Sequence, residues 1–249
     1  MLAAGYATRL SPLTDSIPKM LLPLAERPML DYLLDRIREV EEIDEIHLVT
    51  NSRFAPAFEE WAPDDMIVHD DGTTSNDDRL GAIGDVAFAI EQGGLAGDDL
   101  LVVAGDNLVG YSLPDFVEFW RRKGGSAIAV NELPDRELLR NYGVVELDDS
   151  DRVVGFEEKP AEPRSNLAAT AAYLYQGEDL ELLPRYLEDG NPPDAPGNFA
   201  AWLHTRAPVH GYRVSGEWHD VGDLGQLLAA DNLLREQAGL PQRTEYSLD

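Results

Sequence analysis

The 249-residue sequence contains no cysteine, only three lysines among its 20 basic residues, and no apolar run of about eighteen residues. The absence of cysteine excludes disulfide bonds, thiolate catalysis and cysteine-bound zinc. The absence of a long apolar run means that no membrane-spanning helix is expected. The first residues also lack the basic region of a secretory signal. Together these absences predict a cytoplasmic protein without a membrane partner.

The charge is strongly one-sided, with 47 acidic residues against 20 basic ones and a formal net charge of −27. A nucleic-acid partner is not expected, because no basic patch could neutralise its phosphates. Apolar residues make up 43% of the chain, which is enough for a folded core. The excess of acid therefore predicts a solvated, halophilic surface adapted to a salty cytoplasm.

Apolar periodicity alternates between helix and strand along the first half of the chain. Helices are predicted over 28–37, 82–90 and 115–122, and strands over 46–49, 100–104 and 127–130. This alternation predicts an α/β fold with a doubly wound, mostly parallel (Rossmann-like) sheet and helices on both faces.

The second half of the chain has a different pattern of predicted elements. Short strands are predicted over 143–146, 153–157 and 169–175 between polar turns, followed by a closing helix over 223–237. We expect one domain, composed of a first half over 1–140, a small mixed β half that binds substrate over 141–238, and a loose tail over 239–249. The stretch 190–197, rich in proline and glycine, is predicted to be a structured loop.

The strongest signal is LAAGYATRL at residues 2–10, followed by PKMLLP at 18–23. An apolar strand that enters a loop of small residues lets backbone N–H groups come close to a phosphate or a base. Arg9 and Lys19 add two positive charges to the same region. The spacing matches neither the dinucleotide fingerprint nor the Walker A loop.

This block resembles the signature of the sugar-1-phosphate nucleotidylyltransferases, which include the glucose-1-phosphate thymidylyltransferases and uridylyltransferases. Further family-like blocks follow in order: GDN at 105–107, YGVVE at 142–146, EEKP at 157–160 and WHDVG at 218–222. The resemblance covers nearly the whole chain. It implies that a nucleoside triphosphate, with dTTP or UTP favoured, reacts with a sugar 1-phosphate to give an NDP-sugar and pyrophosphate.

The resemblance also implies a role for each matching position. Arg9 and Lys19 would be catalytic, because they would neutralise the phosphates of the triphosphate. The expected nucleotide contacts are Leu2, Ala3, Ala4, Gly5, Thr8, Leu80 and Gly81. The expected sugar-phosphate contacts are Asn107, Gly143, Glu158, Lys159, Asn166 and Thr170.

Asp106 and Asp220 are the candidate ligands for Mg²⁺. Asp106 comes just after an expected buried strand, where open α/β sheets place their ligands. Mg²⁺ is a hard cation that prefers one or two carboxylates together with substrate phosphates. Asp220 is similar to the family's second metal carboxylate, and this assignment rests on the resemblance.

The scarcity of lysine is itself informative. Lys19 and Lys159 both lie in family-like blocks of a chain that otherwise uses arginine as its basic residue. An ammonium is a compact charge, whereas arginine presents a wide planar fork. Replacing lysine by arginine at a phosphate contact would therefore be sterically unfavourable. The third lysine, Lys123, follows Arg121 and Arg122 at an expected helix end and is predicted to compensate the helix dipole.

Two other functions stay open. The chain could be a cytidylyltransferase for another phosphorylated alcohol, or a catalytically silent nucleotide sensor. The base, the sugar and a possible homo-oligomeric state are not set by the sequence. Ala7 stands where the family usually has glycine, so the loop must differ slightly if this position needs a positive φ. Met1 falls inside the expected first strand, which the resemblance implies to be longer.

Overall fold

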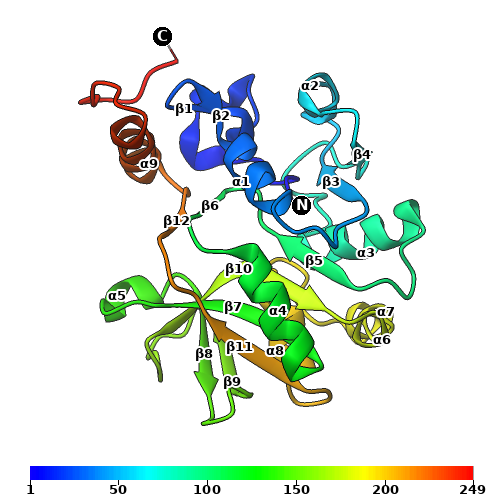
Figure 1. Ribbon diagram of the computed structural model, residues 1–249. Helices are drawn as coiled ribbons and strands as arrows, with labels where there is room; N and C mark the ends of the chain where they lie inside the picture. The colour runs from blue at the N-terminus through cyan, green and yellow to red at the C-terminus, as the bar shows by residue number, and fades with distance from the viewer. Residues whose placement is uncertain (249) are drawn as a thin grey trace.

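A mixed β-sheet runs through the molecule, with parallel strands on one side (Figure 1). This computed structural model describes residues 1–248. β3 (Ile46–Thr50) pairs in parallel with β4 (Met66–Asp70). Leu2 bridges β3 in parallel at Val49 and also bridges Ala104, at the end of β5 (Leu100–Val103). The first residues of the chain therefore join β3 and β4 to the rest of the sheet.

The other side of the sheet is organised around a long strand, β10 (Leu167–Tyr175). It runs antiparallel to β5, to β7 (Ser126–Glu132) and to β8 (Gly143–Leu147). β9 (Val153–Glu158) is antiparallel to β8, and β11 (Val209–Arg213) is parallel to β7. The predicted α/β fold is confirmed, but the sheet is more mixed than predicted. The links between β8, β9 and β10 contain no crossover helix, which a parallel neighbour would require.

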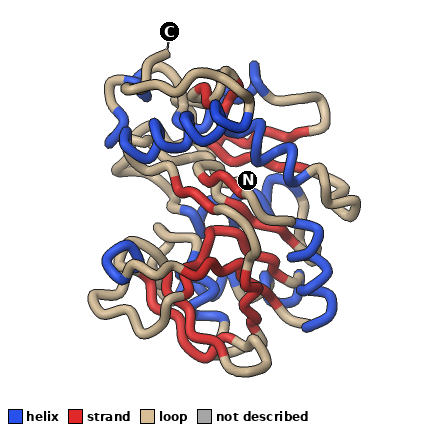
Figure 2. Tube along the Cα trace, turned by 60° about the vertical axis from the view of Figure 1, so that its left-hand side comes forward, coloured by secondary structure: helices blue, strands red, loops and turns tan. Residues whose placement is uncertain are grey.

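Alternate residues of the central strands point to opposite faces of the sheet and form two apolar cores. In β5, Val103 belongs to the core that α1 (Met29–Ile37) and α4 (Leu113–Lys123) cover. Its neighbour Val102 belongs to the core covered by α3 (Ala82–Gly93). The predicted helices on both faces are therefore present, and the strands lie between them in Figure 2.

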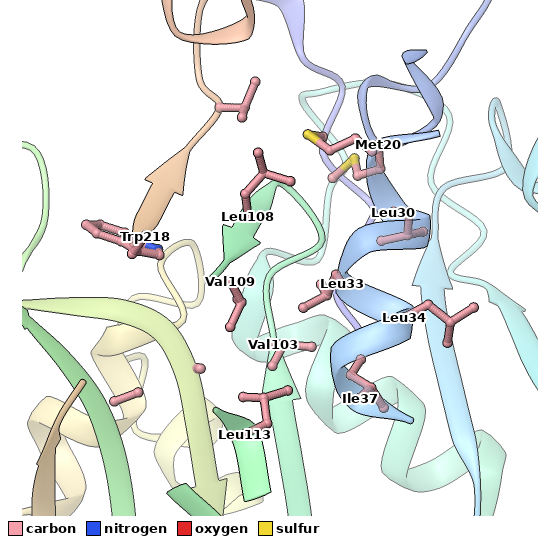
Figure 3. Packing of buried hydrophobic residues seen from close by; sticks show 14 of the residues in the cluster. Met20, Leu30, Leu33, Leu34, Ile37, Val103, Leu108, Val109, Leu113 and Trp218 are labelled. Atoms are coloured by element: carbon pink, nitrogen blue, oxygen red, sulfur yellow. The ribbon is translucent and has the colours of Figure 1, made fainter. Parts of the chain in front are cut away.

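The apolar stripe of α1 packs onto the edge of the sheet near β6 (Asn107–Val109). Each fully buried aliphatic side chain stabilises the fold by roughly 1.5–3 kcal/mol relative to an exposed one. This helix is therefore a major anchor of the first half of the chain. Figure 3 shows members of this core: Met20, Leu30, Leu33, Leu34 and Ile37 on and above α1, and Val103, Leu108, Val109, Leu113 and Trp218 on the strands and turns beside it.

α4 has clear signals at both ends. Ser112 caps its N-terminus, since its hydroxyl accepts a hydrogen bond from the Asp115 N–H at 3.1 Å. Its last turn ends in basic residues, as predicted for dipole compensation. The Lys123 ammonium also donates to the Ser150 carbonyl at 2.7 Å and lies 3.0 Å from the Asp151 carboxylate. Lys123 thus has structural partners.

The remaining elements are short, apart from the 14-residue helix α9. The strands are β1 (Pro23–Leu24), β2 (Arg27–Pro28) and β12 (Trp218–Asp220), and the helices are α2 (Ala55–Trp61), α5 (Arg136–Leu139), α6 (Gly177–Leu180), α7 (Leu183–Glu188), α8 (Gly197–Leu203) and α9 (Leu224–Gln237). Single 3₁₀ turns lie at Thr8–Leu10, Leu13–Asp15 and Lys19–Leu21. Within the described part of the chain, no helix is long and apolar enough to cross a membrane.

The sequence predicts a loose tail over 239–249, and the part of it that the structure describes makes specific contacts with the rest of the chain. Tyr246 is buried, and its hydroxyl donates to the Pro23 carbonyl at 2.8 Å. Arg235 donates to the Pro241 carbonyl at 2.5 Å. Polar side chains on α9 and a single aromatic residue therefore hold the segment, and neither produces a periodic sequence pattern. The segment around Tyr246 lies beside β1 (Figure 1).

Candidate active site

Two short strands bring the predicted metal ligands together. β6 and β12 are antiparallel, and Asp220 lies opposite Asn107. The N–H of Val221 donates to the Asp106 carbonyl at 3.0 Å. Asp106 and Asp220, which lie far apart in the sequence, therefore stand at the same end of one two-stranded ribbon.

A chain of hydrogen bonds orients the Asp106 carboxylate. The Trp218 indole N–H donates to Asn107 Oδ1 at 2.6 Å, and Asn107 Nδ2 donates to Asp106 Oδ1 at 2.9 Å. Asn107 is 4% exposed. Both ends of its amide thus have protein partners, and its visible role is to position Asp106 rather than to face a sugar.

Lys19 is bound to the same carboxylate from the opposite side. Its ammonium lies 2.6 Å from Asp106 Oδ2 and donates to the Val221 carbonyl at 2.8 Å. The side chain is 8% exposed, so the contact is largely screened from water. A buried ammonium requires such partners, and Lys19 is therefore a fixed charge at the centre of the site.

The electrostatics of Asp220 show which charges gather around it. Burial raises the pKa of its carboxyl to about 6, and the neighbouring Asp106 adds to the increase. Lys19, Arg9 and Lys159 act in the opposite direction. Five predicted site residues from separate parts of the chain therefore lie within electrostatic reach of one another.

Arg9 can lie close to this cluster because the residue after Val221 is a glycine. A Cβ on Gly222 would lie 3.1 Å from Arg9 Nη2, so a larger residue would push the guanidinium away. The Gly222 N–H donates to Gln226 Oε1 at 2.8 Å, which holds the turn against α9. Arg9 itself is exposed and can meet a ligand from solvent.

The loop between Gly5 and Arg9 adopts the conformation that glycine would favour. Ala7 has φ 48° and ψ 38°, in the left-handed region. Its carbonyl accepts hydrogen bonds from the Leu10 N–H and from the Thr14 hydroxyl, both at 3.0 Å. Positive φ is therefore retained with alanine in place. Thr8, a predicted nucleotide contact, is exposed at the start of the turn.

Side chains at the end of β3 fix the predicted nucleotide contacts that precede this loop. The Thr50 hydroxyl donates to the Ala3 carbonyl at 3.2 Å, and Asn51 Nδ2 donates to the Ala4 carbonyl at 2.9 Å. Leu2 is a sheet residue, with its N–H bonded to Val103 and its carbonyl to Gly105. Gly5 is exposed and has open space beside it.

The start of α3 supplies the other predicted nucleotide contacts, Leu80 and Gly81. Gly81 has φ 79°, and a Cβ there would lie 2.7 Å from the Pro193 carbonyl oxygen, so only glycine fits. The Ile83 N–H donates to the same carbonyl at 2.9 Å. The proline-rich loop is therefore ordered against α3, as predicted, and Leu80 is half-buried beside it.

Glu158 and Gly143 lie together. They face each other across β8 and β9, and a Cβ on Gly143 would come within 2.9 Å of Glu158 Oε2. Gly197, at the start of α8, leaves room for the same oxygen. Burial raises the pKa of Glu158, and Lys159 opposes the increase. Lys159 is exposed, and its N–H donates to the Tyr142 carbonyl at 3.0 Å.

The last two predicted sugar-side residues have other partners. Asn166 Nδ2 donates to Glu132 Oε1 at 2.6 Å on an exposed strand end. The Thr170 hydroxyl donates to the Ala129 carbonyl at 3.1 Å and pairs with the Tyr111 hydroxyl at 2.9 Å. Thr170 is 1% exposed. Nothing in its surroundings favours the predicted sugar contact, because its hydroxyl is fully used within the core.

The model of the nucleotidyl transferase family matches residues 1–237. The chain belongs to this family. It is 31% identical over 244 residues to the glucose-1-phosphate thymidylyltransferase of Streptomyces griseus, covering 95% of this chain and 65% of that protein. It is 29% identical over 235 residues to the UTP–glucose-1-phosphate uridylyltransferase of Synechocystis, covering 89% and 59%. The chain thus spans about three-fifths of the length of these curated relatives.

Solved structures of pyrophosphorylases share the fold of this chain. A UDP-glucose pyrophosphorylase complexed with UDP-glucose has a TM-score of 0.81 at 18% identity, covering 95% of this chain and 97% of that one. The UTP-bound enzyme of Acinetobacter baumannii has a TM-score of 0.75 at 23% identity, covering 97% and 93%. At this level of identity the likeness establishes the fold alone.

Several residues of the site were not identified by sequence reasoning. Thr50 and Asn51 are 0% exposed and fix the signature loop; their position at the end of a buried strand is the only signal they give. Tyr142 belongs to the YGVVE block. Burial raises the pKa of its phenol to about 12, and the carboxylates of Asp220 and Asp106 contribute to the increase. Its hydroxyl therefore lies near the acidic pair Asp106 and Asp220.

A cavity of about 630 Å³ lies elsewhere. It is found between β3 and β5, beside the Met1 amino group, which donates to the His47 carbonyl at 2.7 Å. Burial lowers the pKa of this amine to about 5. The lining includes Glu45 and Asp99 but no lysine or arginine, so it does not suit a phosphate. Of the predicted site residues, only Leu2 lines it.

Proposed function

We propose that this chain transfers a nucleotidyl group from a nucleoside triphosphate, with dTTP or UTP favoured, to a sugar 1-phosphate and releases pyrophosphate. The observation that carries the proposal is the gathering of Arg9, Lys19 and Lys159 around Asp220, beside Asp106. Three preorganised cations suit a reaction between two polyanions, because they neutralise charge without reorganising. The names of the two relatives and the UDP-glucose and UTP of the two solved structures support this substrate class.

The protein's part in this reaction is to position phosphates. An oxygen of the sugar phosphate attacks the α-phosphorus of the triphosphate, the bond from the α-phosphorus to the bridging oxygen breaks, and pyrophosphate leaves. Exposed Arg9 would hold the leaving phosphates through its planar fork. Lys19 would neutralise the α-phosphate, and Lys159 would hold the attacking phosphate. Correct placement of two reactants can supply about 7–11 kcal/mol of the barrier reduction.

Lys19 can take a phosphate partner during this cycle without giving up its present ones. Its ammonium is shared between the Asp106 carboxylate and the Val221 carbonyl. An ammonium has three donors, so a phosphate oxygen can take the third position. The contact with Asp106 keeps the lysine pointed at the site before substrate arrives.

The residues around Asp220 fit a divalent cation. Residues 1–248 contain no group of three or more His, Asp or Glu side chains placed to hold a metal. Two adjacent carboxylates, one with its pKa raised by burial and by the other, suit Mg²⁺, which takes its remaining ligands from phosphates and water. Asp106 and Asp220 would hold the ion. When bound, Mg²⁺ supplies charge neutralisation for the phosphate oxygens.

The halves of the chain would divide the substrates between them. We infer that residues 1–140 bind the nucleotide and 141–238 the sugar phosphate, because Arg9 and Lys19 come from the first half and Lys159 from the second. A doubly wound form of the α/β fold is supported by the parallel strands β3, β4 and β5 and by the helices on both faces of the sheet. The acidic composition supports work in a salty cytoplasm.

The test is pyrophosphate release over a grid of triphosphates and sugar 1-phosphates, with Asp106→Asn as the inactive control. Release with UTP or dTTP and a hexose 1-phosphate, absent in the variant, supports the proposal. Release only with CTP and a polyol phosphate would establish the cytidylyltransferase alternative. Triphosphate binding without release over the whole grid would establish the silent sensor.

A further inference from the structure

The cavity between β3 and β5 continues the line of residues 1–3. These residues form a short parallel strand between the two: the Leu2 N–H donates to the Val103 carbonyl at 2.9 Å, and the Ala3 N–H donates to the Val49 carbonyl at 2.8 Å. Both β3 and β5 begin three residues before these partners. They therefore flank a slot about 10 Å long, in which a strand of about three residues can lie.

The edges of this slot carry backbone groups without partners. Residues two apart in a strand direct their N–H and C=O groups to the same edge. Val103 bonds Leu2, so Leu101 also points its backbone groups toward the slot. In β3, Val49 bonds the short strand in the same way, so His47 does too. Within the described part of the chain, no backbone partner is found for the N–H groups of His47, Leu101 and Val103 or for the Leu101 carbonyl. Two facing edges of this kind are a template for a strand between them.

The slot is apolar on both faces of the sheet. Ile37 and Ile43 line it from the core that α1 covers, and Val86 and Leu100 line it from the core that α3 covers. A strand buried on both faces has a continuous apolar run rather than an alternating one. The slot therefore suits consecutive β-branched apolar residues, which also favour the strand conformation.

The Met1 nitrogen has the position of a peptide N–H in this ladder. It donates to the His47 carbonyl at 2.7 Å, and the Met1 carbonyl accepts from the Val49 N–H at 3.0 Å. An ammonium has three donors and a charge, and burial lowers the pKa of this amine to about 5. A peptide N–H has one donor and no charge, so it would occupy the same position without a desolvation penalty for a charge.

Acidic side chains surround the outer end of the slot, where β3 and β5 begin. The exposed acids among the lining residues are Glu42, Asp44, Glu45, Asp98 and Asp99. Glu42 is paired with Arg121, and Glu45 lies 3.0 Å from His47, whereas the slot itself is lined by no lysine or arginine. Negative charge of this density attracts a cation. A basic residue is therefore favoured at the outer end of a strand that fills the slot.

We propose that the slot is a strand-binding site for an extended apolar segment on the N-terminal side of Met1, joined to it by a peptide bond and bearing a basic residue at the outer end. The segment runs parallel to β3 and β5, with about three residues between them. Its backbone pairs with the free groups on both edges and extends the link between β3 and β5 along their whole length. The site lies outside the cation cluster, so it does not depend on the proposed reaction.

The experiment compares the 249-residue chain with chains extended before Met1, by thermal unfolding and by amide hydrogen exchange. Extension by Met-Lys-Val-Val-Val should raise the Tm by roughly 5–10 °C, because three valines become buried and their backbone is paired. It should also slow the exchange of the His47, Leu101 and Val103 amides by at least about tenfold. An unchanged Tm, or unchanged exchange at these amides, would overturn the proposal.

The matched control is extension by Met-Lys-Ser-Asn-Ser, which has the same length and charge but cannot fill an apolar slot. It should leave the Tm and these amides unchanged, and an increase equal to that of the valine extension would contradict the proposal. Met-Glu-Val-Val-Val should give a smaller increase in dilute buffer and the full increase near 1 M salt, where the screening length falls to about 3 Å. An equal increase at both salt concentrations would remove the basic residue from the assignment. An equal increase when acetylated Lys-Val-Val-Val amide is added to the 249-residue chain would overturn the attachment to Met1.

Discussion

Replacing Asp220 by asparagine should stabilise the protein while abolishing its activity. The carboxyl pKa rises from 3.8 in an unfolded chain to about 6, first because of burial and then because of Asp106. Asparagine keeps the shape of the side chain and cannot ionise. The substitution therefore removes a charge that the folded state tolerates poorly, together with the charge that the proposed reaction needs.

The magnitude follows from the pKa shift. A shift of about two units at about 1.4 kcal/mol each corresponds to roughly 3 kcal/mol, an upper value for ionised Asp220. The folded state binds this proton more tightly than the unfolded chain does, so stability falls as the pH rises from about 4 to about 6 and stays lower above it. Asp220→Asn should therefore raise the free energy of unfolding by up to roughly 3 kcal/mol at pH 7.5, and by almost nothing near pH 4.

Thermal unfolding of metal-free protein, followed by circular dichroism across this pH range, checks the prediction. For a chain of this length, roughly 3 kcal/mol corresponds to an increase in Tm of about 6–12 °C. Exposed Asp64→Asn is the matched control and should leave the Tm unchanged. An increase of the same size at both ends of the pH range would refute the reasoning, as would a lower Tm for Asp220→Asn at pH 7.5.

Three further outcomes follow from the structure. Lys19→Arg and Lys159→Arg should each lower kcat/KM by roughly 10²–10³ in steady-state assays, whereas Lys123→Arg should be nearly silent; equal effects at all three positions would contradict the phosphate roles. Ala7→Gly should raise the free energy of unfolding by up to about 1 kcal/mol in denaturant titrations, because it relieves a left-handed alanine. The control Ala89→Gly in α3 should lower the free energy of unfolding by about 1 kcal/mol. If Ala7→Gly lowered it as well, strain at Ala7 would be ruled out. Finally, because about 1 M salt shortens the screening length to about 3 Å, KM for the triphosphate should fall and the Tm should rise from dilute to molar salt, and full activity and stability in dilute buffer would exclude a halophilic protein.

The sequence by itself determined the elements with strong periodicity. The stripe of α1 predicted its helix to within one residue of the observed start, and the apolar run before Asp106 predicted β5. The family-like blocks identified Arg9 and Lys19. These features depend on local patterning and on motifs in which each residue type has its own chemistry. The sequence alone is therefore sufficient to predict them.

Only the tertiary structure decided which of these residues meet. The pairing of β6 with β12 placed Asp220 beside Asp106, and the same arrangement turned Asn107 into a support for Asp106. Thr170, predicted as a sugar contact, lies in the core because β10 pairs with three strands. Long-range strand pairing has no local sequence signal, since register and neighbours are chosen by burial over the whole sheet. For the same reason the buried acids Asp71 and Asp85 look like ordinary surface acids in a sequence with 47 of them, until the fold removes them from water.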